Sequence, residues 1–210
     1  MINIGVLGST NGTDLQAVLD AADKKMIDAS INIVISNRKN AYILKRSAAR
    51  GVETSFVSQK NKTREEFDRE ITSLLEAHQV ELVLLIGFMR ILSQEFCNHW
   101  QDKILNVHPS LLPKYAGGMD TNIHQEVLTN GDHKTGCTIH FVTEKVDSGP
   151  ILIQKSCQVE KDDTVESLKK RVQTLEGQAF IEAINLITSC LLYTSPSPRD
   201  ATLSRMPSSG

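Results

Sequence analysis

The chain has 210 residues, of which 40% are apolar and 23% are charged, so it is long enough for one domain with a full hydrophobic core and has the composition of a soluble globular protein. Its formal net charge of -2 provides no general attraction to nucleic acid or to an anionic membrane. No apolar run approaches the ~20 residues that span a bilayer, and we expect no secretory signal because the N-terminus lacks a basic stretch and a cleavage site.

Strands and helices alternate through the first half of the chain. Short apolar runs predict buried strands at 2–8, 31–36, 53–57 and 82–86. Capped or amphipathic segments predict helices at 13–25, 42–50 and 63–78. The first helix is expected to begin with a capping box formed by Thr13 and Gln16. The alternation predicts a single-domain α/β fold with an open, mostly parallel sheet flanked by helices, Rossmann-like in its N-terminal half.

The regular alternation of strands and helices ends in the second half of the chain. A fifth strand is predicted at 104–108, followed by a long loop to residue 120. Helices are predicted at 121–130 and 164–187, and paired strands at 138–143 and 151–159. Residues 189–210 are rich in serine and proline and have no helical or strand period. We therefore expect one domain over 1–188 and a disordered or artefactual tail over 189–210, which resembles translated adapter sequence.

The loop from Gly8 to Asp14 follows a strand and opens a helix. Backbone N–H groups at a helix N-terminus, approached closely through glycine, suit a phosphate. The spacing is not GxGxxG, so the loop does not predict a dinucleotide site. From the residues alone, a tight turn between strand and helix is an equally good interpretation.

Asn106, His108 and Asp147 are the candidates for proton transfer and charge stabilisation. Asn106 and His108 lie two apart on a predicted strand, so their side chains share one face at its carboxyl end. An amide can donate to a developing oxyanion and an imidazole can move protons near neutral pH. A carboxylate near the imidazole, such as Asp147, is expected to raise its pKa. The alternatives are hydrogen-bonded scaffolding for the Asn-x-His pair and ordinary turn chemistry for Asp147.

The remaining histidines and the cysteines carry weaker signals. His140 alternates within a predicted strand and is expected to be half-buried and structural, whereas His124 lies near the long loop. The chain has no HExxH, GxSxG or P-loop motif, so no metal site is expected. Its cysteines are scattered without a CxxC pair, which indicates free thiols and a cytoplasmic protein: Cys97, Cys137, Cys157 and Cys190.

Four segments together resemble the phosphoribosylglycinamide formyltransferase family of folate-dependent formyltransferases. They lie at residues 87–93, 105–114, 136–142 and 146–151. The second contains Asn-Val-His-Pro-Ser-Leu-Leu-Pro, and the fourth contains Asp-Ser-Gly-Pro. The resemblance extends from Met1 to about Thr188, so it covers the chain before the expected tail.

The resemblance implies the reaction and the site. The donor would be 10-formyltetrahydrofolate and the acceptor the amine of glycinamide ribonucleotide, in purine synthesis, with no metal. The implied catalytic residues are Asn106, His108 and Asp147. The implied folate-binding residues are Arg64, Met89, Arg90, Ile91, Leu92, Asn106, Thr143, Glu144, Lys145, Val146 and Asp147. The implied ribonucleotide-binding residues are Gly12, Thr13, Asp14 and Glu176, where Asp14 replaces the asparagine that is common in the family.

Several other functions compete with this interpretation. A formyltransferase could act on methionyl-tRNA or on an amino-sugar nucleotide, but the tRNA enzymes would need a further domain and a basic patch. A formylfolate hydrolase would carry an N-terminal regulatory domain. A non-catalytic nucleotide-binding module would not need Asn106, His108 and Asp147 together, and the absent GxGxxG argues against a dehydrogenase. We therefore expect small-molecule substrates, no nucleic-acid or membrane partner, and a monomer or homodimer.

Overall fold

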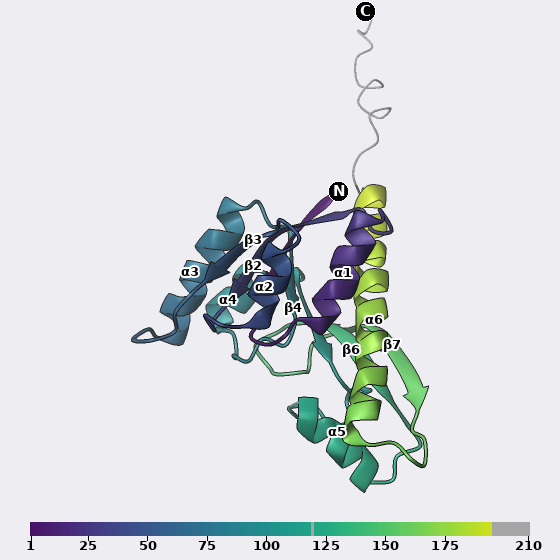
Figure 1. Ribbon diagram of the computed structural model, residues 1–210. Coiled ribbons are helices and arrows are strands. Elements are labelled where there is room, and N and C mark those ends of the chain that lie inside the picture. Colours follow the sequence, from purple (N-terminus) through teal and green to yellow (C-terminus); the bar gives the residue numbers. More distant parts are fainter. Residues whose placement is uncertain (119, 195–210) are drawn as a thin grey trace, which may run out of the picture.

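One open sheet with helices on both faces forms the domain (Figure 1). The computed structural model describes residues 1–118 and 120–194. The strands are β1 (Ile2–Leu7), β2 (Ala29–Ser36), β3 (Glu53–Phe56), β4 (Leu82–Leu85), β5 (Ile104–His108), β6 (Lys134–Phe141) and β7 (Ile151–Gln158). The helices are α1 (Thr13–Asp23), α2 (Tyr42–Ala48), α3 (Arg64–Ala77), α4 (Gln94–His99), α5 (Asp120–Thr129) and α6 (Val165–Thr194).

The sheet has seven strands in the order β3-β2-β1-β4-β5-β6-β7. The first five strands in this order, from β3 to β5, pair in parallel with their neighbours. Strand β6 runs antiparallel to β5, and β7 runs antiparallel to β6. The expected open, mostly parallel sheet is therefore confirmed. The strand order reverses between β1 and β4, and ligands of open α/β sheets bind at the carboxyl ends of the strands at such a point.

Alternating strand residues divide the core between the two faces of the sheet. Ile4, Val6 and Leu84 face α1 and α6, which lie side by side in Figure 1. Leu7 and Val83 face the other layer, formed by α3 and α4. Because both faces are covered, the central strands consist almost entirely of apolar residues, as expected for buried parallel strands.

The start of α1 differs from the prediction. The predicted capping box at Thr13 is wrong, because Gly12 is the N-cap, with a φ of 63°, and no side chain caps the helix. Gln16 instead donates to the Asp20 carboxylate and accepts from Arg46. Glycine is required at this position because a Cβ on Gly12 would lie 2.4 Å from a carbon of Ile43.

Three other boundaries differ from the sequence analysis. Helix α4 was not predicted, because six residues are too few to show a helical period. Strand β6 begins at Lys134 rather than 138, and Gly136 within it lies so close to β7 that a Cβ would meet the Lys155 carbonyl. Helix α6 continues to Thr194, past the boundary expected at 188, and residues 195–210 of the expected tail lie outside the described residues. No helix in the described ranges is both long and apolar enough to cross a membrane.

Candidate active site

A cleft of about 1240 Å³ opens at the carboxyl ends of β1, β4 and β5. It brings together residues that lie far apart in the sequence. Among the predicted residues, those lining it are Thr13, Asp14, Met89, Arg90, Ile91, Leu92, Asn106, His108, Thr143, Glu144, Lys145, Val146, Asp147 and Glu176. Gly12 is buried behind this lining, and Arg64 lies exposed at the start of α3 and does not line the cleft. The role of Arg64 in folate binding stays a prediction.

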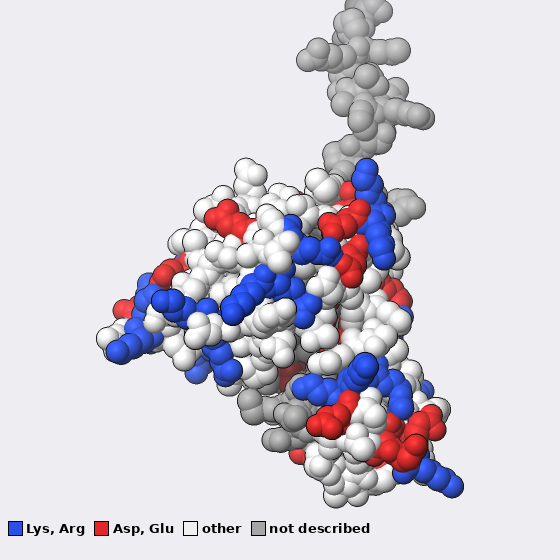
Figure 2. Space-filling model, viewed as in Figure 1, with Lys and Arg blue, Asp and Glu red and all other residues white. Residues whose placement is uncertain are grey.

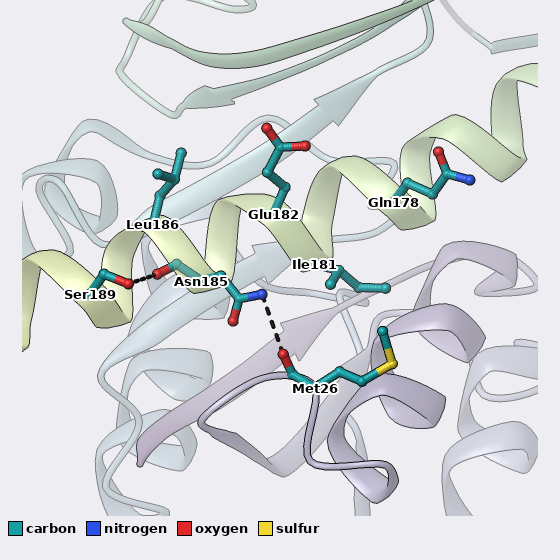
Figure 3. Close-up of a pocket in the computed structure, with 7 residues that line it drawn as sticks. All are labelled: Met26, Gln178, Ile181, Glu182, Asn185, Leu186 and Ser189. Atoms are coloured by element: carbon teal, nitrogen blue, oxygen red, sulfur yellow. Dashed lines mark hydrogen bonds between the residues drawn. The ribbon is translucent and has the colours of Figure 1, made fainter.

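A second, smaller hollow of about 430 Å³ lies along α6, beside the connection between α1 and β2. Figure 3 shows Met26 and Ile181 on either side of it, with the Asn185 amide donating to the Met26 carbonyl at 3.3 Å. Its lining is mainly apolar, and the carboxylate of Glu182 is held by Lys155 at 2.5 Å. This hollow contains none of the predicted site residues.

The three predicted catalytic side chains meet in the cleft. Strand β5 presents Asn106 and His108 on one face, and the loop between β6 and β7 brings Asp147 to them. Nδ1 of His108 lies 3.3 Å from the Asp147 carboxylate. The same carboxylate accepts the Gly117 N–H at 2.8 Å. In that loop Gly149 cannot carry a side chain, because a Cβ would lie 1.8 Å from the Phe141 carbonyl oxygen.

A fourth side chain, His140, belongs to the same cluster. It stands opposite Asn106 in the antiparallel pairing of β5 with β6 and is only 2% exposed. Its Nε2 lies 3.1 Å from Nδ2 of Asn106 and 3.5 Å from the Asp147 carboxylate, while Nδ1 donates to the Phe141 carbonyl. The expectation that His140 is half-buried is therefore wrong, because the side chain is fully buried beside the predicted catalytic residues. The register of the two strands, which the sequence does not specify, is what places it in the site.

Burial and neighbouring acceptors act on the pKa of His108 in opposite directions. Burial, with the side chain 4% exposed, lowers the pKa of His108 because the imidazolium is poorly solvated there. The Asp147 carboxylate and the Tyr115 carbonyl, 2.9 Å from Nε2, both favour the cation, but they do not offset the burial. Asp147 therefore raises the pKa as expected, but the net pKa of His108 lies below its usual value because the effect of burial is larger.

Asp147 keeps its negative charge. Burial raises the pKa of its carboxyl group, but the contact with His140, the Gly117 N–H and the charge of His108 together bring the pKa below its usual value. The imidazole of His108 therefore faces a fixed carboxylate. A proton that arrives on His108 during a reaction would be stabilised at once by a charge already in place.

The N-terminal loop and α6 form one end of the cleft. Thr13 and Asp14 open α1, where the first N–H groups of a helix have no partner within it. On α6, Glu176 is 6% exposed, and Lys169 and Gln173 line the cleft on the same helix face, at i, i+4 and i+7. Lys169 and Gln173 were not predicted, although their spacing from Glu176 could have indicated them.

Hydrogen bonds connect this end of the cleft to the predicted folate segment. The Ser9 hydroxyl accepts the N–H of Met89 at 2.9 Å and donates to the Asn37 amide oxygen at 2.6 Å. Gln59 accepts from both Asn37 and Arg90, at 3.2 and 2.7 Å. The loops after β1, β2, β3 and β4 are thereby joined to one another by side-chain hydrogen bonds. Within the described ranges, no group of three His, Cys, Asp or Glu residues could hold a metal ion.

The parallel half-sheet, with an Asn, His and Asp cluster at the carboxyl end of β5, defines an α/β protein with a candidate catalytic site. The family model described as formyl transferase matches residues 2–184, and the chain belongs to that family.

Similar proteins and solved structures extend the match over most of the chain. The phosphoribosylglycinamide formyltransferase of Escherichia coli is 39% identical over 85% of this chain and 84% of its own length. A crystal structure of glycinamide ribonucleotide transformylase 1 from Symbiobacterium toebii superimposes with a TM-score of 0.86 at 39% identity, covering 90% of this chain and 88% of that one. The trifunctional purine biosynthetic protein adenosine-3 of Gallus gallus is 42% identical over 90% of this chain, which spans only 18% of that protein's length.

Proposed function

We propose that the chain transfers the formyl group of 10-formyltetrahydrofolate to the amine of glycinamide ribonucleotide, a step of purine synthesis. The observation that carries the proposal is the Asn106, His108 and Asp147 cluster, which lies in the cleft between the phosphate-type loop and the 89–92 segment. The E. coli and Haemophilus influenzae relatives, each covered over more than four-fifths of its length, are named for this activity. The free thiols of Cys97, Cys137 and Cys157 support a cytoplasmic location.

The two substrates would enter from opposite ends of the cleft. At one end Gly12, Thr13 and Asp14 would bind the phosphate of the ribonucleotide, with Glu176 contacting its sugar or amide portion. At the other end two segments, residues 89–92 and 143–147, would bind the folate rings, and Arg64 would reach the same substrate. The amine and the formyl carbon would then meet beside His108, so that positioning supplies much of the rate.

The residues of the cluster would stabilise charge and move one proton. As the amine adds to the formyl carbon, the carbonyl oxygen becomes negative and would accept a hydrogen bond from the Asn106 amide. Because Nε2 of His108 already donates to the Tyr115 carbonyl, the proton that the amine loses would pass through water to Nδ1, and the imidazolium would be stabilised by the Asp147 carboxylate at 3.3 Å. The same proton would pass to the folate nitrogen as the carbon–nitrogen bond to the donor breaks. No covalent bond to the protein forms, and His108 ends the cycle neutral.

The test is formyl transfer followed through the absorbance of the folate product, with and without glycinamide ribonucleotide. We expect turnover only when the ribonucleotide is present. His108→Ala and Asp147→Ala should lose turnover and still bind folate, measured by fluorescence titration. Turnover that does not depend on the ribonucleotide would show a hydrolase and would overturn the proposal, as would near-normal turnover in either variant.

A further inference from the structure

Helix α2 holds the loop that precedes α1. The N–H of Ile43 donates to the Thr10 carbonyl at 3.1 Å, and Nε of Arg46 donates to the Asn11 carbonyl at 3.1 Å. A second nitrogen of the same guanidinium donates to the Gln16 side chain at 2.6 Å. Gly12 packs against Ile43 so closely that no side chain would fit between them. Two consecutive carbonyl groups of the loop are thus bound to α2.

The orientation of these carbonyls fixes the orientation of two N–H groups. In a planar trans peptide the N–H points opposite to the C=O of the same unit. The Thr10 carbonyl shares its peptide unit with the Asn11 N–H, and the Asn11 carbonyl shares its unit with the Gly12 N–H. Because both carbonyls point toward α2, both N–H groups point away from it. The neighbouring residues Asn11 and Thr13 line the cleft. The Arg46 contact is the hydrogen bond that ties the Asn11–Gly12 peptide to α2, beside the packing of Gly12 against Ile43.

The surroundings of Arg46 add positive charge to this end of the cleft. Residues 38–50 contain five basic side chains and no acidic one, and Figure 2 shows lysine and arginine side chains gathered over α2. The Arg46 guanidinium also lies 5.3 Å from the centre of the Tyr42 ring, which limits its movement. Arg50, one turn further on, is instead paired with Asp20 and Asp23 of α1.

We propose that Arg46 is a positioning residue for the phosphate of the acceptor substrate: it orients the Asn11–Gly12 peptide so that the amide faces the anion. The proposal rests on the proposed function. The guanidinium acts through the loop rather than by touching the substrate, and its planar, two-point contact is one that lysine cannot reproduce.

Steady-state kinetics of Arg46→Met and Arg46→Lys, with Arg50→Met as the matched control, test the proposal. We expect Arg46→Met to raise KM for the ribonucleotide about tenfold or more, with kcat within about threefold and KM for the folate within about twofold. Arg46→Lys should also raise KM for the ribonucleotide, by less than Arg46→Met does. If the methionine variant fails to fold, the KM of the lysine variant tests the proposal instead. Arg50→Met should leave both KM values unchanged.

Calorimetric binding of ribose 5-phosphate provides a readout that does not depend on turnover. The unsubstituted chain should bind it, and Arg46→Met should bind it about tenfold more weakly. A ribonucleotide KM no higher than that of Arg50→Met would overturn the proposal, as would equal losses in kcat and in both KM values, which would indicate a purely structural role. Failure of the unsubstituted chain to use the ribonucleotide, together with the predicted loss of ribose 5-phosphate binding in Arg46→Met, would refute the proposed acceptor and support the role of Arg46.

Discussion

Replacing Asp147 with asparagine isolates the charge that faces His108. The substitution keeps the size of the side chain and removes a carboxylate that lies 3.3 Å from Nδ1 of the imidazole. In the folded protein burial lowers the pKa of His108, and Asp147 opposes that effect. Without the carboxylate the pKa of His108 should fall further, and the imidazolium formed during the reaction should be less stable.

The size of the kinetic effect follows from the geometry. At 3.3 Å and an effective dielectric constant of about 20, two unit charges attract by roughly 5 kcal/mol. Removing one partner of a buried pair typically costs about 3–5 kcal/mol. Taking the lower figure of about 3 kcal/mol, because the charge on His108 exists only part of the time, kcat should fall about 100-fold in Asp147→Asn.

Two measurements check this prediction. Proton NMR titration of the His108 ring, assigned by comparison with His108→Ala, should give a pKa below the usual 6.5 in the unsubstituted chain and a lower one in Asp147→Asn. Turnover at saturating substrates should show the loss in kcat. A pKa that rises or stays constant in Asp147→Asn, or a kcat within about threefold of normal, would refute the reasoning.

Three further predictions concern the oxyanion, the phosphate loop and the stability of α6. Asn106→Ala should reduce kcat about 100-fold in the formyl-transfer assay, because one donor to the developing oxyanion is lost; a change confined to KM would contradict it. Asp14→Asn should lower KM for the ribonucleotide about threefold by removing a like charge near its phosphate, whereas an unchanged or higher KM would show that the carboxylate does not oppose binding. Arg171 forms two hydrogen bonds with Asp163, at 2.6 and 2.9 Å, and holds the pKa of Asp163 at about 2, against an ordinary 3.8. That stabilisation is present above pH 3.8 and is lost as the pH falls toward 2. Asp163→Asn should therefore lower the free energy of unfolding by about 1–2 kcal/mol at pH 7 and by almost nothing at pH 2. Urea titrations at the two pH values, with Asp162→Asn as the control, measure this difference.

The parallel half of the sheet could be predicted because its local patterns agree with the final structure. Buried parallel strands are short apolar runs, and each helix between them carries one apolar stripe. Periodicity alone therefore gave the order of these strands and helices along the chain. The predictions were wrong where a tertiary contact decides the conformation. Gly12 caps α1 in place of Thr13 because the loop packs against Ile43, and Gly136 lies inside β6 because β7 approaches it closely.

The same distinction applies to the site. Asn106 and His108 could be placed together because residues two apart on a strand share a face. The position of His140 depends on the register of β6 against β5, and no short-range pattern specifies that register. The pKa of His108 depends on how much water reaches the ring, and a sequence contains no measure of that exposure.

Formyl transfer by the unsubstituted chain, measured with and without glycinamide ribonucleotide and repeated with His108→Ala, tests the central claim most directly. The account predicts product from 10-formyltetrahydrofolate only when the ribonucleotide is present, and none above background from His108→Ala. Product formed at the same rate without the ribonucleotide, or by the His108→Ala variant, would contradict it.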